Sequence, residues 1–132
     1  MLNLSVASKD DFNFYKSSKI LNANGREDNK KFILAMSMGY SSKSKLPFNS
    51  KIPLFDASKL TEEDKSLMIA VAIEDTKNID VVSNNEEIFK IAEEYANAGI
   101  KLLKDMEDNN IYDLELEEFE SFVNGKYNKL EL

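Results

Sequence analysis

Residues 84–106 read NNEEIFKIAEEYANAGIKLLKDM and form the longest stretch of the chain with a regular helical period. Their apolar side chains recur at steps of three and four, which places them along one face of a helix. This face comprises Ile88, Ile91, Ala92, Tyr95, Gly99, Leu102, Leu103 and Met106. Ser83 or Asn84 can cap the first turn, and a Glu follows three residues later, as in a capping box. The stretch therefore predicts a long amphipathic helix around which the rest of the chain folds.

The other face of this helix is predicted to be polar and solvent-exposed. It carries Glu86, Lys90, Glu93, Glu94, Lys101, Lys104 and Asp105. Ala92, Ala96 and Gly99 are small and lie near one another on the helix surface, so we expect another element to approach closely there. These features predict a helical domain, and they do not identify its function.

The composition limits the class of protein and the kinds of site. The chain has 132 residues, of which 42% are hydrophobic, so we expect one domain over residues 1–132, with residues 1–25 and 125–132 only partly ordered. The absence of Cys and His excludes thiol nucleophiles, disulfides, imidazole bases and most zinc sites. No run of about 18 apolar residues is present to span a membrane. The N-terminus lacks the features of a signal peptide, and we expect a cytoplasmic protein.

Other helices are predicted on both sides of the central one. A short helix could form over residues 10–21. Residues 27–38 are rich in apolar side chains and predict a largely buried helix that ends at Gly39, in the position where a left-handed residue terminates helices. The apolar run 67–73 follows a capping box at residues 61–64 and predicts a central helix packed against residues 84–106. A last helix is expected from about residue 113 to residue 125.

The remaining segments are predicted to be loops or short extended pieces. Residues 40–59 contain both prolines, which exclude a continuous helix, and we expect a long loop with an extended piece at residues 52–55. Residues 78–82 could form a short strand or the extended approach to the next helix. The predicted fold class is mainly α, a small single-domain bundle of about four helices with at most a minor two-stranded element.

The charge is unevenly distributed along the chain. The net charge is −7, with +5 on residues 1–60 and −12 on residues 61–132. Both halves could be solvated surfaces that attract each other within the fold, and they could also recognise a charged partner. The candidate partner-binding residues are the acidic Glu115, Glu117, Glu118 and Glu120 and the basic Lys43, Lys45 and Lys51.

Carboxylates are the only plausible catalytic groups. Glu93 and Asn97 share one helix face, and Glu94 lies about 100° around the helix from Glu93. Neither this spacing nor any phosphate-binding loop matches a known signature, so we expect an exposed acidic face and no catalytic, metal or cofactor site. Direct nucleic-acid binding is not expected at a pI near 4.7, although the basic loop has Tyr40 and Phe48 nearby.

Three segments carry a family resemblance. They are KFILAMSMGY at residues 31–40, LTEEDKSLMIAVAI at residues 60–73 and IAEEYANAGIKLL at residues 91–103. Together they resemble the Dnd system-associated protein 4 family, small proteins found beside bacterial DNA phosphorothioation and anti-phage islands. The resemblance covers about residues 26–106, and EEYANAGI at residues 93–100 is its most specific part.

The resemblance implies a non-enzymatic accessory or adaptor subunit in DNA-modification-linked anti-phage defence. Its partner would be a larger protein component of the defence system, and it supplies no catalytic residues. The alternative is a small acidic phage-type inhibitor, an anti-defence protein or DNA mimic, that blocks a nucleic-acid-binding protein. The partner's identity and the oligomeric state stay open.

Overall fold

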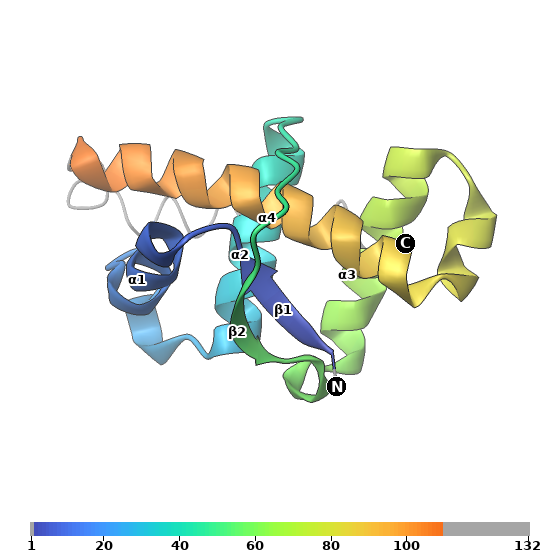
Figure 1. Cartoon of the computed structure of the whole chain (residues 1–132), viewed down its shortest axis with the longest axis horizontal. Helices are drawn as coiled ribbons and strands as arrows, with labels where there is room; N and C mark the ends of the chain where they lie inside the picture. The colour runs from blue at the N-terminus through green and yellow to red at the C-terminus, as the bar shows by residue number, and fades with distance from the viewer. Residues whose placement is uncertain (1, 110–132) are drawn as a thin grey trace.

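The computed structural model describes residues 2–109, which form four α-helices and a two-stranded antiparallel sheet (Figure 1). The helices are α1 (Lys9–Ser17), α2 (Asp28–Ser41), α3 (Glu62–Thr76) and α4 (Asn85–Asp108), and the strands are β1 (Asn3–Val6) and β2 (Ile52–Asp56). Short 3-10 helices, η1 (Ala23–Gly25), η2 (Ala57–Lys59) and η3 (Ile79–Ser83), occur between them. The prediction of a mainly α domain with a minor two-stranded element is confirmed. The last predicted helix, from about residue 113, lies outside the described residues.

The helix α4 is the longest element, and the others pack along it (Figure 1). Its first turn is capped by Asn84, whose side chain accepts a hydrogen bond from the Glu87 N–H, as the sequence predicted. In Figure 1, α1 lies under its C-terminal half, α3 beside its N-terminal half, and α2 crosses it near the middle. None of the helices in residues 2–109 combines the length and the apolar character needed to cross a membrane.

Two glycines allow α2 and α4 to touch through their backbones. A Cβ atom on Gly99 would lie 1.7 Å from the Ala35 carbonyl oxygen, and one on Gly39 would lie 2.0 Å from the Tyr95 carbonyl oxygen. The close packing predicted at Gly99 is therefore present, and its partner is α2. The prediction that Gly39 ends the helix is wrong, because α2 continues to Ser41 and Gly39 serves the helix crossing.

The end of α2 instead uses a lysine in the left-handed conformation. Lys43 has φ 54°, its N–H donates to the Tyr40 carbonyl, and the N–H of Ser44 donates back to the Gly39 carbonyl. This pair of bonds is the Schellman pattern that usually has glycine at the left-handed position. The chain leaves the helix there and runs back over α4.

The helix α3 begins as predicted and is less central than predicted. Thr61 and Asp64 form the expected capping box, and α3 packs against α4. Ile69 and Ile73 are only half-buried, so one side of α3 is open, whereas α2 has buried residues on all sides. The following residues form the 3-10 helix η3 rather than a strand.

The N-terminal residues are more structured than the sequence predicted. The strand β1 pairs with β2 antiparallel, with a break in register between Leu4 and Ser5, and the Leu4 side chain is fully buried. In α1 the carboxylate of Asp11 bonds to the ammonium groups of Lys101 and Lys104 on α4, at 2.7 and 2.6 Å. The conformation of these residues, which local sequence patterns did not predict, is thus determined by contacts with α4, about ninety residues later in the sequence.

Candidate functional site

The two glutamates of the EEYANAGI segment are buried, and the prediction of an exposed acidic face is wrong at these positions. Glu93 is 4% exposed and Glu94 is 8% exposed. One oxygen of Glu93 accepts the backbone N–H of Ser5 in β1 at 2.7 Å, and the other pairs with the Lys51 ammonium at 2.8 Å. The Glu93 carboxylate therefore joins α4 to β1 and to the chain before β2. It is engaged in holding the fold together.

Asn97 and the α4 backbone hold the next part of the chain. The Leu46 N–H donates to the Glu94 carbonyl at 3.1 Å, and the Leu46 carbonyl accepts from the Asn97 side-chain amide at 3.0 Å. Both main-chain groups of Leu46 are thus bonded to α4. Glu93 and Asn97, which share one face of α4, thus make two separate structural contacts, one with Lys51 and one with Leu46.

Tyr95 links α4 to α3, because its hydroxyl group donates a hydrogen bond to the Asp75 carboxylate at 2.6 Å. The Lys45 ammonium bonds to the same carboxylate at 3.0 Å, and the Tyr40 ring packs edge-on against the Tyr95 ring. Burial raises the pKa of Asp75, but the bonds from Tyr95 and Lys45 outweigh it and leave the pKa below the usual 3.8. Burial and the bond to Asp75 raise the pKa of Tyr95, so its hydroxyl stays protonated as a hydrogen-bond donor.

Together these contacts define a braced loop, residues 42–51, which lies over α4 between α2 and β2. Its main chain is fixed at Leu46, and its lysines Lys45 and Lys51 are paired with Asp75 and Glu93. The Leu46 side chain remains 42% exposed. The loop is therefore bonded to α3 and α4 on its inner side and presents an apolar side chain on its outer side.

The structure describes only the three lysines among the candidate partner-binding residues. Lys43, Lys45 and Lys51 are all exposed on the braced loop, and the last two also form the internal ion pairs described above. The acidic candidates Glu115, Glu117, Glu118 and Glu120 lie outside the described residues. Ion pairs within the domain join the basic first half of the sequence to the acidic second half. They are Lys30–Asp64, Lys45–Asp75 and Lys51–Glu93. Part of the charge asymmetry is thus used within the fold.

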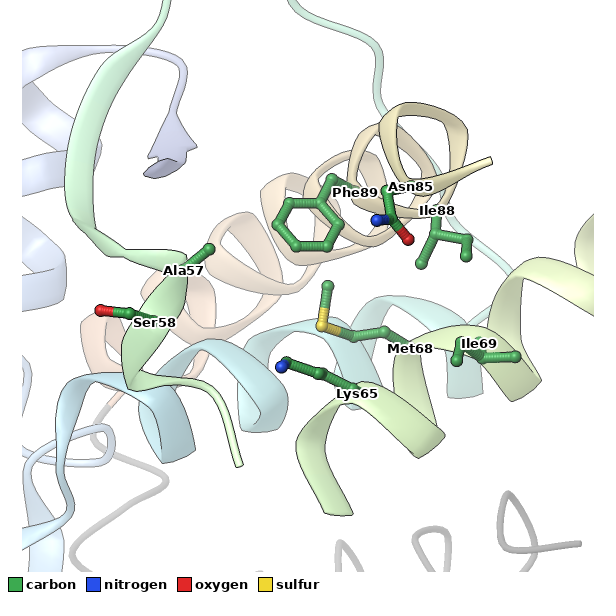
Figure 2. A pocket seen from close by; sticks show the side chains of 8 residues that line it. All are labelled: Ala57, Ser58, Lys65, Met68, Ile69, Asn85, Ile88 and Phe89. Carbon is green, nitrogen blue, oxygen red and sulfur yellow. The ribbon is translucent and has the colours of Figure 1, made fainter. Parts of the chain in front are cut away.

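A second surface feature is an open cleft between η2, α3 and the first turns of α4 (Figure 2). Its volume is about 320 Å³, and its lining residues are Ala57, Ser58, Lys65, Met68, Ile69, Asn85, Ile88 and Phe89. Figure 2 shows the Met68 side chain of α3 pointing toward the Phe89 ring of α4. Among the described residues that line the cleft, Lys65 alone is charged. The cleft can accept an apolar group. No local pattern in the sequence predicts it, because three separate segments build it.

The described residues offer binding features and no recognisable catalytic arrangement. Within residues 2–109, no three acidic side chains are grouped as metal ligands would be, and the chain has neither Cys nor His. Within EEYANAGI, the Glu93 carboxylate, the Tyr95 hydroxyl and the Asn97 amide nitrogen make structural contacts. Among the surface features of residues 2–109, the braced loop and the cleft beside Phe89 are suited to binding.

The family model for DNA sulphur modification system-associated protein 4 matches residues 23–127. Neither a curated protein nor a solved structure matches the chain.

Proposed function

Because the chain belongs to the DNA sulphur modification system-associated protein 4 family, we propose that it is a non-enzymatic accessory subunit of such a system, acting by binding a larger protein component. The family match confirms the resemblance found in the sequence. Association with a DNA sulphur modification system follows from the family description. The adaptor role, the protein partner and a part in antiviral defence are the proposal.

One observation carries the proposal: the most specific segment of the sequence builds a support for a surface loop. Glu93 binds β1 and Lys51, Tyr95 binds Asp75, and Asn97 binds the backbone of Leu46. A general acid or base needs access to its substrate and a proton to exchange, and these groups are instead buried and bonded to their own chain. A segment used in this way supports recognition of a partner by the loop it holds.

The acidic inhibitor, the alternative function, receives no specific support. It depends on the acidic residues after residue 109, which the structure does not describe. The family match connects the chain with a modification system rather than with an inhibitor of one. The accessory role is therefore the function that we put forward.

Co-purification with the other proteins of the system tests the role. The full chain should form a stable complex with at least one component, measured by size-exclusion chromatography with light scattering. Purified alone, it should show no turnover of DNA, RNA or ATP with Mg²⁺ or Mn²⁺. The proposal fails if the protein binds no component. It also fails if the isolated protein has an activity that disappears in a folded Glu94→Gln variant.

A further inference from the structure

We propose that the braced loop, residues 42–51, is the docking surface for an acidic segment of a protein partner, with an apolar partner side chain covering Leu46. This inference rests on the proposed accessory function and names the surface and the chemistry through which it would act. Three properties of the loop support it: its fixed backbone, its exposed apolar centre and its excess of lysine.

The backbone of the loop is fixed before any partner arrives. Both main-chain groups of Leu46 are bonded to α4, and ion pairs anchor the lysines on either side of it. A loop already held in its bound conformation loses little conformational entropy on association, so more of the contact energy becomes affinity. Such bracing suits a loop that must present one conformation.

The centre of the loop is apolar and exposed. The Leu46 side chain is 42% exposed although its backbone is tied down, the following Pro47 is also exposed, and Phe48 is half-buried. A single exposed leucine on a protein surface is ordinary. Here the exposed leucine lies beside an exposed proline in a segment fixed by main-chain bonds, which is a suitable anchor for a partner's apolar side chain.

The charge around this centre is basic. Residues 42–55 contain Lys43, Lys45 and Lys51 and no acidic residue. Lys45 and Lys51 are paired on their inner sides, yet their side chains remain 36% and 51% exposed. An ammonium group has three N–H donors, so each retains donors for a carboxylate approaching from outside. A partner segment with carboxylates flanking an apolar residue matches this pattern, and the charges would mainly increase the association rate.

A protein partner fits these observations better than a nucleic acid does. The whole chain carries −7, which disfavours binding along a phosphate backbone. The exposed centre consists of leucine and proline, whereas single-stranded nucleic acids are bound by exposed aromatic rings on which bases stack. Nucleic acid and a second copy of this chain are therefore alternatives that the experiment must distinguish.

The experiment uses two matched pairs of variants of the full chain. Leu46→Asp is compared with Ile79→Asp, since both residues are exposed aliphatics, at 42% and 64%, but Ile79 lies on η3. Lys43→Glu is compared with Lys77→Glu, because both are exposed lysines at positive φ, 54° and 57°. Circular dichroism melting first establishes that all four variants fold. Isothermal titration calorimetry then measures Kd for the component that co-purifies with the wild type.

We expect the two loop variants to weaken binding by about tenfold or more, as removal of an interface anchor does, and the two controls to stay near the wild-type Kd. Wild-type binding should also weaken as NaCl is raised. Loop variants that bind like the wild type would overturn the inference while leaving the accessory function intact. Failure of the wild type to bind any component would overturn both.

Two further measurements address the other occupants. Fluorescence anisotropy with a labelled DNA duplex or single strand would overturn the inference if Lys43→Glu abolished a tight interaction of the wild type. Light scattering would overturn it if the wild type were a dimer that Leu46→Asp converted to a monomer. Absence of both effects, together with loss of the protein complex, would establish the loop as a protein-docking surface.

Discussion

Substitution of Gly99 by Ala tests the helix crossing on which the fold depends. The new methyl carbon would lie 1.7 Å from the carbonyl oxygen of Ala35 and 2.6 Å from its carbonyl carbon. The first distance is about half the 3.5 Å at which non-bonded atoms attract one another. Both obstructing atoms belong to the backbone of α2, so no side-chain rotation relieves the overlap. The two helices must move apart where they now touch.

The expected loss of stability follows from two opposing terms. Overpacking a core costs about 1–3 kcal/mol. We expect about 3 kcal/mol for Gly99→Ala, because the atoms that it would overlap belong to the backbone and cannot rotate away. Alanine recovers about 1 kcal/mol because it favours helix more than glycine does. The free energy of unfolding should therefore fall by about 2 kcal/mol. For a domain of this size that corresponds to a decrease in Tm of roughly 6–10 °C.

Urea unfolding followed by circular dichroism at the helical band measures this change, since the chain has no Trp. Ser66→Ala, at an exposed position of α3, is the control and should change stability by less than about 0.5 kcal/mol. Gly39→Ala should also destabilise, and the double variant should lose less than the sum, because both glycines serve one crossing. A Gly99→Ala protein as stable as the wild type would refute the close packing.

Three further predictions concern stability. Leu103 is fully buried, so Leu103→Ala should lower the free energy of unfolding by about 2–5 kcal/mol in the same urea assay. Burial raises the pKa of Asp11, but hydrogen bonds from Lys101 and Lys104 outweigh this effect and keep the pKa below 3.8. The stability that these bonds contribute is complete above about pH 4 and is lost as the pH falls through the folded-state pKa. Asp11→Asn should therefore make stability less dependent on pH between about pH 5 and pH 2. An unchanged acid midpoint would contradict this. Lys43→Gly should raise the free energy of unfolding by about 0.5 kcal/mol. Glycine relieves about 1–2 kcal/mol of left-handed backbone strain, which exceeds the conformational entropy that it adds to the unfolded chain. A lower Tm would argue against strain at this position.

Local sequence patterns predicted the elements whose determinants are local. The apolar period of residues 84–106 and the capping box at Thr61 and Asp64 both lie within a few turns of one helix, and both are present. The same kind of reasoning failed at Gly39. A glycine after an apolar run resembles a helix end, and only the position of α4 reveals that the glycine is needed for close approach.

The buried glutamates show a second limit of periodicity. A helical pattern assigns charged residues to the solvent-exposed face, and it cannot anticipate that another segment will cover part of that face. Glu93 is covered because β1 and the braced loop meet there, and its partners Ser5 and Lys51 are far away in sequence. The lysines of the candidate site were identifiable from composition, but their bracing by α4 depends on contacts across the whole domain.

The contacts of the N-terminal region have a consequence for how the chain folds during synthesis. The N–H of Ser5 needs Glu93, the Asp11 carboxylate needs Lys101 and Lys104, and the Ser18 hydroxyl donates to Glu107 at 2.5 Å. Residues 5–18 are synthesised before α4, the last helix of the described residues, and therefore wait for it before they find their partners. At about 5–20 residues per second, the ninety residues between them take several seconds to make, during which Leu4 and its neighbours have no core to enter. Folding of the described residues is thus expected to be completed late, when α4 emerges and its contacts with β1 and α1 form.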